Sequence, residues 1–251
     1  MDLQGKVSLI TGGTSGIGAA TALRLARRGS HVASISRKGA SGITDDRLLS
    51  AIATHGVTIR FMEADVGDPS ACRGCANEVA REFGRLDVVV HSAGKPFLGD
   101  LFAVTDDDWM EAFSIHVHSV FHLTRAAIPY IKQQQGGAII LIGSAGGLRG
   151  CLGSLAYGVA KGALPQFARN LARELADDGI RVNCVSPGII RTPFQDFLTP
   201  EQTANNIQNR IPLHREGTPD DVAELIVSLI ENDFITGENF VIDGGMTMRM
   251  V

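Results

Sequence analysis

The sequence has few of the features that mark membrane, nucleic-acid-binding or disordered proteins. Its longest apolar runs have only the length of a β-strand, so we expect no membrane-spanning helix. Acidic and basic residues are mixed along the chain, and the formal net charge is −4. No basic tract indicates binding to nucleic acid, and no acidic tail indicates disorder. The first residues lack the layout of a signal peptide, so we expect a cytoplasmic protein.

Cysteine is also scarce, which argues against a disulfide scaffold and against a zinc site. The four cysteines in 251 residues are too few and too scattered for a disulfide framework. Cys72 and Cys75 form a C-x-x-C pair, but a structural zinc site needs a second pair at suitable spacing. The other two, Cys151 and Cys184, are isolated in the sequence, so we predict no metal site.

The chain instead alternates short apolar runs with helix-like segments. The runs are nearly continuous in apolar residues, as in strands that are covered on both faces of a parallel sheet. Repeated β-α-β units predict one doubly wound α/β domain over residues 1–251, with a seven-stranded, mostly parallel sheet between two helix layers. The predicted strands are 7–11, 31–36, 58–63, 86–91, 138–142, 181–185 and 239–242. The predicted helices are 19–28, 48–55, 70–83, 107–133, 156–176 and one that begins after Thr218.

A glycine-rich segment, T-G-G-T-S-G-I-G, connects the first predicted strand to the first predicted helix. Gly12 allows a tight turn, Gly16 lets the backbone approach a pyrophosphate, and Gly18 lets the helix pack closely on the strand. The helix N-terminus then faces the anion. This context predicts a dinucleotide site rather than a glycine-rich turn without a ligand. Its expected contacts are Gly12, Thr14, Ser15, Gly16, Ile17 and Gly18.

Tyr157 and Lys161 lie four residues apart in a predicted helix, which puts both side chains on one face. A free phenol has a pKa of about 10 and is a poor acid or base near neutrality. An ammonium ~4 Å away, at an effective dielectric constant of ~20, favours the phenolate by roughly 4 kcal/mol, or about three pKa units. The pair could therefore transfer protons near neutral pH. The alternative is an aromatic ring packed under a lysine stem.

Together these motifs resemble the short-chain dehydrogenase/reductase family, in its compact branch of about this length. The resemblance covers essentially the whole chain. It rests on the T-G-x-x-x-G-x-G spacing, the Y-x-x-x-K motif, Ser144 thirteen residues before Tyr157, and Pro187-Gly188 after the sixth strand. It implies a Rossmann fold, a nicotinamide cofactor and hydride transfer between that cofactor and a carbonyl or secondary alcohol.

The resemblance also implies roles for individual residues. Tyr157 donates a proton to the carbonyl oxygen in reduction, or takes it from the alcohol in oxidation. Lys161 lowers the tyrosine pKa and binds the nicotinamide ribose. Ser144 hydrogen-bonds the substrate oxygen. Further cofactor contacts are implied for Asp65, Val66, Ala93, Gly94, Pro187, Gly188, Ile190 and Thr192, in addition to Tyr157 and Lys161.

The end of the second strand predicts the type of nicotinamide cofactor. NAD-preferring dinucleotide folds have an acidic residue here that binds the adenine ribose. Ser36 occupies this position, and Arg37 follows it, where it could pair with a 2′-phosphate. We therefore predict NADP(H) as the favoured cofactor, with NAD(H) possible. The alternative is a solvated Arg37–Lys38 pair beyond the strand end.

The chain departs from the family pattern at two asparagines. His116 stands where the family usually has the Asn that holds a water linking the lysine to solvent. An imidazole can donate and accept, so His116 either replaces this relay or is a tolerated packing substitution. His91 stands where another Asn is expected, at a strand end near the cofactor, and we assign it no chemistry.

The expected substrate lid is 192–215, and Pro96, Phe97 and Leu98 are expected to form another wall. Phe194 and Phe197 in the lid suit a moderately apolar small molecule. In general pattern the chain is similar to 3-oxoacyl-carrier-protein reductases and to sugar or polyol dehydrogenases.

Two alternatives to a carbonyl reductase remain open. The carrier-protein reductases dock their partner through basic residues, but Pro129 and Asp178 stand at the matching positions, which disfavours a 3-oxoacyl thioester reductase. The other alternative is a nucleotide-binding regulatory protein with little turnover. The resemblance implies a homotetramer, with a homodimer as the alternative.

Overall fold

A parallel β-sheet forms the centre of the protein in the computed structural model, which describes residues 1–43, 47–48, 50 and 56–248. Among these residues the sheet has seven strands in the order β3-β2-β1-β4-β5-β6-β7. Each strand pair is parallel, so the predicted α/β fold is confirmed, without an antiparallel strand. The strands are β1 (Val7–Thr11), β2 (His31–Ser36), β3 (Ile59–Glu63), β4 (Val88–His91), β5 (Gly137–Ile142), β6 (Ile180–Pro187) and β7 (Asn239–Ile242).

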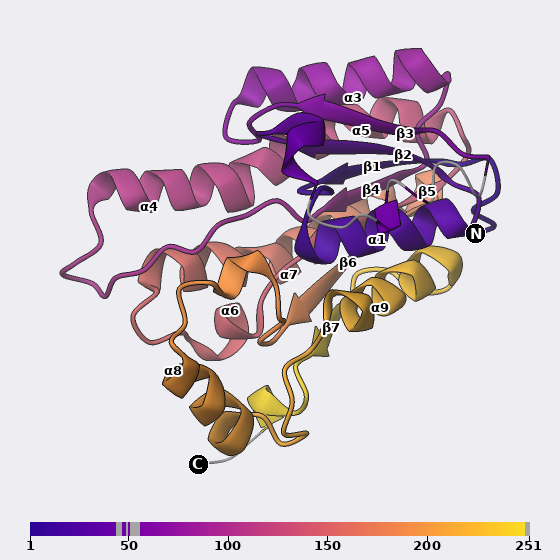
Figure 1. Ribbon diagram of the computed structural model, residues 1–251. Helices are drawn as coiled ribbons and strands as arrows, with labels where there is room; N and C mark the ends of the chain where they lie inside the picture. The colour runs from indigo at the N-terminus through magenta and orange to yellow at the C-terminus, as the bar shows by residue number, and fades with distance from the viewer. Residues whose placement is uncertain (44–46, 49, 51–55, 249–251) are drawn as a thin grey trace.

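Helices cover both faces of this sheet, as the apolar strands predict (Figure 1). One face carries α1 (Gly16–Arg27) and α9 (Pro219–Glu231). The other carries α3 (Pro69–Phe83), α5 (Ser119–Lys132) and α7 (Leu155–Leu175). A buried apolar cluster lies between the sheet and each helix layer. No helix among the described residues is long and apolar enough to cross a membrane.

Local hydrogen bonds fix the ends of several helices. Thr218 and Asp221 form a capping box at the start of α9, in which each side chain accepts from the other residue's N–H. Thr105 caps α4 (Asp106–Phe113) by accepting from the N–H of Asp108. Helix α3 ends at Gly84, whose φ of 70° is in the left-handed region. These helix ends lie close to the predicted positions because capping depends on neighbouring residues.

The predicted continuous helix over 107–133 is wrong in one respect. It is interrupted by a π-helical segment, Ser114–His118, between α4 and α5. A π-helical turn holds one more residue than an α-helical turn, so it changes the direction in which the following side chains point. The predicted helix 48–55 lies mostly outside the described residues.

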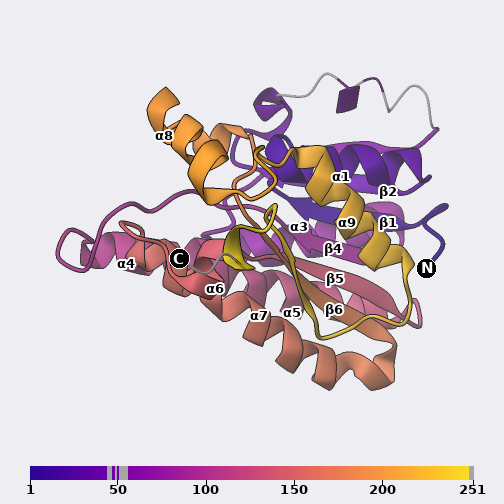
Figure 2. The same ribbon diagram turned by 90° about the horizontal axis from the view of Figure 1, so that it is seen from below.

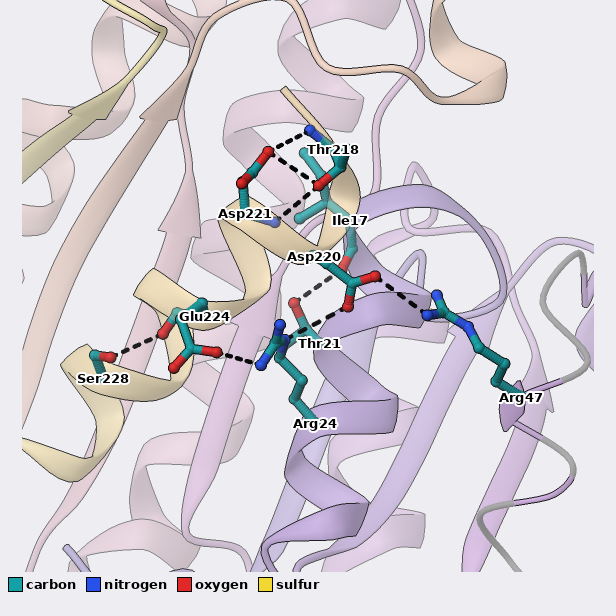
Figure 3. A network of polar contacts seen from close by, with 9 residues as sticks. All are labelled: Ile17, Thr21, Arg24, Arg47, Thr218, Asp220, Asp221, Glu224 and Ser228. Atoms are coloured by element: carbon teal, nitrogen blue, oxygen red, sulfur yellow. Dashed lines mark hydrogen bonds and ion pairs between the residues drawn. The ribbon is translucent and has the colours of Figure 1, made fainter. Parts of the chain in front are cut away.

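Ion pairs join the helix that follows the glycine loop to α9 (Figure 3). The Arg24 guanidinium contacts both Asp220 and Glu224, and Arg47 contacts Asp220 from the other side. These side chains are partly exposed to solvent, so each pair contributes only about 0–1 kcal/mol. Their common effect is to connect α1, which follows the glycine loop, to α9.

Several elements extend beyond the carboxyl ends of the strands (Figure 2). They are α4, α6 (Ala145–Arg149) and α8 (Pro200–Asn205), and the described C-terminal residues lie near α6. The order of the strands reverses between β1 and β4, because β2 and β3 lie on one side of this pair and β5 to β7 on the other. In doubly wound sheets, ligands bind in the crevice at this reversal.

Candidate active site

The loops after β1 and β4 lie against each other at the reversal of the strand order. The Thr11 hydroxyl at the end of β1 accepts hydrogen bonds from the N–H groups of Ser92 and Ala93, at 3.1 and 3.0 Å. Gly12 has a φ of +70°, and a Cβ there would lie 3.0 Å from Ala93 Cα. A Cβ on Gly18 would lie 2.2 Å from the carbonyl oxygen of Gly12. Only glycine therefore fits both positions.

Two neighbouring cavities follow these loops. The larger, about 360 Å³, extends from the glycine loop to Ser144 and Tyr157. The smaller, about 150 Å³, reaches the end of β2. All the predicted cofactor contacts line one or both, except Gly18, which packs beneath the loop. They are Gly12, Thr14, Ser15, Gly16, Ile17, Ser36, Arg37, Asp65, Val66, Ala93, Gly94, Tyr157, Lys161, Pro187, Gly188, Ile190 and Thr192.

These residues fit a dinucleotide. Ser15 precedes α1 but its side chain makes no capping hydrogen bond, so the first N–H groups of the helix stay open to an anion. The glycine loop lines both cavities through Gly12 and Ser15, where a pyrophosphate between two nucleosides would lie. The larger cavity then suits the nicotinamide half and the smaller one the adenosine half.

The three predicted catalytic side chains meet on one wall of the larger cavity. Ser144 follows β5, and its hydroxyl accepts from the N–H of Gly146 at the start of α6. Tyr157 lies in the first turn of α7, and Lys161 follows one turn later. The Lys161 side chain is only 5% exposed, and its ammonium donates to the carbonyl oxygen of Ile142 at 2.6 Å.

The predicted lowering of the tyrosine pKa is not what the structure gives. Burial raises the pKa of Tyr157 to about 12, and the hydrogen bond with Ser144 opposes this only partly. Burial also lowers the pKa of Lys161 to about 8. The Lys161 ammonium lies 6.0 Å from the centre of the tyrosine ring and points to Ile142 instead. The phenol is therefore held in its protonated form, as a proton donor.

Comparison with known proteins agrees with this arrangement. Residues 12–247 match the family model described as enoyl-(acyl carrier protein) reductase. The chain is 34% identical to the 3-oxoacyl-[acyl-carrier-protein] reductase FabG of Thermotoga maritima, over 99% of this chain and 100% of that protein. It is 33% identical to dehydrogenase/reductase SDR family member 4 of Oryctolagus cuniculus, over 99% of this chain and 96% of that protein. The chain belongs to the short-chain dehydrogenase/reductase family.

The solved structures that resemble the chain include other members of the family. L-Sorbose reductase from Gluconobacter frateurii, complexed with NADPH and L-sorbose, superposes with a TM-score of 0.88 at 29% identity. That comparison covers 100% of both chains. The protein is accordingly a short-chain dehydrogenase/reductase and an NAD(P)-dependent oxidoreductase.

His116 lies beside Tyr157 and does not line either cavity. It is fully buried in the π-helical segment, and its ring meets the Tyr157 ring edge-on, with centroids 5.4 Å apart. Its Nε2 lies 3.0 Å from the carbonyl oxygen of Lys95, which can only accept, so Nε2 carries the proton. Burial, and then the charge of Lys161, lowers its pKa well below the usual range. His116 is a neutral imidazole of fixed tautomer.

The prediction that residues 96–98 together form a wall of the substrate site is only partly correct. Pro96 lines the cavity, but Phe97 is buried behind His116, and Leu98 is 56% exposed. From the predicted lid 192–215, Phe194 lines the cavity, with its ring centroid 5.7 Å from that of Tyr157. Phe197 is 44% exposed.

Sequence reasoning missed Lys95, which lines both cavities. Its ammonium pairs with Glu111 at 2.7 Å, and its carbonyl oxygen is the acceptor that fixes His116. Its position directly after Ala93-Gly94 is the one signal that could have identified it.

We expect position 94 to tolerate only glycine, because the His116 ring lies directly against it. A Cβ on Gly94 would lie 2.6 Å from Cε1 and 3.2 Å from Nδ1 of the buried imidazole. We expect Gly94→Ala to lower the free energy of unfolding by about 1–3 kcal/mol in the wild-type background. Most of this loss should disappear in a His116→Asn background, because the smaller side chain leaves room for the methyl group. Urea unfolding of the four proteins measures this coupling.

Gly74→Ala is the matched control, since a Cβ there meets nothing within 4 Å and the position is within α3. It should stabilise the protein by roughly 0.5–1 kcal/mol. An equal cost of Gly94→Ala in both backgrounds would contradict the proposed contact with His116.

The buried Lys161 ammonium should make stability depend on pH. Its pKa is about 8 in the folded protein and 10.5 as a free group. Below pH 8 Lys161 is charged in both the folded and the unfolded protein, so the folded protein bears the full cost of burying the ammonium. Between these two values the unfolded chain keeps the proton that the folded protein has lost, so stability rises with pH. The wild type should gain about 3 kcal/mol relative to Lys161→Met across this interval.

Unfolding of wild type and Lys161→Met at several pH values from 7 to 10 checks this slope. The control Lys132→Met removes a surface lysine that pairs with Asp178. Its free energy of unfolding should differ from that of the wild type by nearly the same amount at every pH. If the free energies of unfolding of wild type and Lys161→Met also differed by the same amount at every pH, the Lys161 ammonium would not be desolvated in the folded protein.

Proposed function

We propose that the protein is an NADP(H)-dependent carbonyl reductase or alcohol dehydrogenase for a small or medium, uncharged substrate. The observation that carries this proposal is the convergence of Ser144, Tyr157 and Lys161 on the wall of a cavity that begins at the glycine loop. A regulatory protein that only binds nucleotide would not need this set of three side chains.

Each of the three side chains has a separate task. The protonated Tyr157 hydroxyl donates its proton to the substrate oxygen in reduction. The Ser144 hydroxyl hydrogen-bonds the same oxygen and stabilises the charge that develops there. Lys161 brings a positive charge to the floor of the cavity. A bound nicotinamide cofactor supplies or accepts the hydride.

Two residues of the chain and one similar structure support NADP(H). The end of β2 has Ser36 in place of an acidic residue, and its hydroxyl donates to the carbonyl oxygen of Gly39. Arg37 lines the smaller cavity, where a guanidinium can pair with a 2′-phosphate. The Gluconobacter frateurii relative is complexed with NADPH.

The lining of the larger cavity supports an uncharged substrate. Among the described residues that line it, the cations are Lys95 and Lys161, and Lys95 already pairs with Glu111. Pro96, Pro193 and Phe194 add apolar surface beside Tyr157. A moderately apolar ketone or secondary alcohol fits this lining best.

A 3-oxoacyl thioester reductase is the second candidate, because the Thermotoga maritima relative is a 3-oxoacyl-[acyl-carrier-protein] reductase. Two residues disfavour it. Pro129 lies within α5, and Asp178 already pairs with Lys132 at 2.7 Å, so neither offers a basic group to an acidic carrier protein. Clear preference for an acyl thioester over simple ketones would favour this candidate.

We also propose a cytoplasmic homotetramer, with a homodimer as the alternative. Large apolar side chains are exposed on separate faces, which subunit contacts would cover. Met110 and Phe121 lie on α4 and α5, whereas Val241 lies on β7. Light scattering of the purified protein distinguishes the two states.

Tyr157→Phe tests the catalytic assignment. Loss of the phenol proton should lower kcat by about 10²–10⁴-fold, while the affinity for the cofactor changes little. Tyr130→Phe is a matched control, because the chain has two tyrosines and Tyr130 lies on α5, hydrogen-bonded to Asn77. The assay is a panel of ketones and secondary alcohols with each cofactor. Tight cofactor binding without turnover on the whole panel would overturn the proposed activity in favour of a regulatory protein.

Arg37→Asp tests the choice of cofactor. Replacing the cation by a carboxylate should lower the ratio of kcat/KM for NADPH to that for NADH by tenfold or more, since a charge-assisted contact of about 1.5–3 kcal/mol is lost. Lys38→Asp makes the same change of charge at a residue that does not line the cavity, and should change the ratio much less. An unchanged ratio in Arg37→Asp would remove the basis for NADP(H).

A further inference from the structure

The two cavities of the candidate active site meet at Lys95. The residues that line both cavities are Gly12 and Ser15 of the glycine loop, and Ala93, Gly94 and Lys95 of the segment after β4. A ligand that fills both cavities therefore passes between the glycine loop and residues 93–95. In a dinucleotide, the part that joins the two nucleosides is the pyrophosphate. Lys95 is thus placed beside the position expected for this group.

Lys95 also brings a positive charge to this junction. Among the described residues that line the cavities, the cations are Arg37, Lys95 and Lys161. Arg37 lines only the smaller cavity, and Lys161 lines only the larger one. A pyrophosphate is an anion, but residues 11–18 of the glycine loop include no charged side chain. The N-terminus of α1 supplies part of the compensating charge, and Lys95 is placed to supply more.

The Lys95 ammonium is paired with α4 in the structure. It lies 2.7 Å from the Glu111 carboxylate and 4.8 Å from the centre of the Phe97 ring. Glu111 lies about one helical turn before Ile115, which lines the smaller cavity, so the pair is at the rim of that cavity. The side chains of Lys95 and Glu111 are 35% and 47% exposed. An ion pair with this exposure is weak and can open at little cost.

The backbone that carries Lys95 is fixed, so only the lysine side chain has to move. The N–H of Ala93 donates to the Thr11 hydroxyl at 3.0 Å. The carbonyl oxygen of Lys95 accepts from Nε2 of His116, also at 3.0 Å. Lysine has a flexible four-carbon stem, and its ammonium acts as a point charge. The ammonium can therefore exchange one anionic partner for another while the loop after β4 keeps its position.

We propose that Lys95 binds the pyrophosphate of the nicotinamide cofactor and that Glu111 competes for the same ammonium. In the cofactor-free protein the ammonium pairs with Glu111. When a dinucleotide is bound, the ammonium leaves Glu111 for the pyrophosphate, which also lies at the positive end of α1. Glu111 then weakens cofactor binding, although it lines neither cavity. This proposal rests on the proposed function, because it requires a dinucleotide in both cavities.

A competition has a different signature from a structural ion pair. If the pair only joined the loop after β4 to α4, removal of either partner should change cofactor binding in the same direction. Under competition, Lys95→Met should raise the Kd for NADP⁺ about tenfold, and Glu111→Gln should lower it about threefold. In a Lys95→Met background, Glu111→Gln should change the Kd little, because Glu111 acts through Lys95. Changes in the same direction would overturn the competition.

Lys132→Met is the matched control for these binding measurements. Lys132 pairs with Asp178 at the same 2.7 Å, their side chains are 45% and 32% exposed, and neither residue lines a cavity. The variant makes the same change in net charge as Lys95→Met, so its Kd for NADP⁺ should equal that of the wild type. An equal rise of the Kd in both variants would mean that net charge decides the affinity, and it would overturn the role of Lys95.

Fragments of the cofactor identify the group that Lys95 contacts. ADP-ribose has the pyrophosphate without a 2′-phosphate, whereas adenosine 2′-monophosphate has the 2′-phosphate without the pyrophosphate. Lys95→Met should weaken ADP-ribose about tenfold and the monophosphate by no more than about twofold, and Arg37→Asp should show the reverse pattern. Displacement of fluorescent NADPH or NADH measures the affinity of both fragments. Equal losses for the two fragments in Lys95→Met would overturn the contact with the pyrophosphate.

Binding is measured without substrate, so that two failures can be distinguished. If the wild type binds a dinucleotide and Lys95→Met binds it equally well, the role of Lys95 is overturned and the proposed function stands. A wild type that binds neither NADP⁺ nor NAD⁺ overturns the proposed function, and this role with it. A crystal structure with ADP-ribose should place the Lys95 ammonium within hydrogen-bond distance of a pyrophosphate oxygen. An ammonium that remains on Glu111 in that complex would overturn the proposal even if a variant did not fold.

Discussion

The hydrogen bonds at Thr11 are the contact on which the rest of the site depends. One hydroxyl at the end of β1 accepts from two N–H groups of the loop that follows β4. Because the strand order reverses between β1 and β4, these two loops leave the sheet in opposite directions, and the hydroxyl holds them together at their origin. The glycine loop becomes one wall of the cleft and the 93–95 segment becomes the other.

The hydrogen bonds at Thr11 also influence the position of Tyr157, through the backbone of the loop after β4. The loop fixed at Ala93 continues to Lys95, whose carbonyl oxygen sets the tautomer of His116. The His116 ring packs against the Tyr157 ring at an interplanar angle of 84°, and the ring centroid of Phe194 lies 5.7 Å from that of Tyr157. The position of the proton donor is thus set by packing and by neutral hydrogen bonds, and burial holds it protonated.

Sequence patterns predicted what depends on neighbouring residues and missed what depends on the fold. The apolar strands, the Thr218 cap and the glycine loop are local features, and they lie where they were expected. Helix α1 begins three residues before its predicted start, because glycine at positions 16 and 18 weakens the helical signal. The spacing of Tyr157 and Lys161 predicts that their side chains lie on one face of the helix, but it does not predict how deeply they are buried. Burial decides the direction in which the pKa of each side chain shifts.

The π-helical segment between α4 and α5 divides one continuous stretch of chain into two helical registers. Each α-helical residue advances by about 100° around the axis, so one additional residue in a turn rotates everything after it by that angle. The face of α5 that packs on the sheet and the face of α4 that packs through Ala112 against Ala156 of α7 are therefore separate requirements on the sequence. Removing one residue from this segment would leave each helix intact, but their faces could no longer both meet the core.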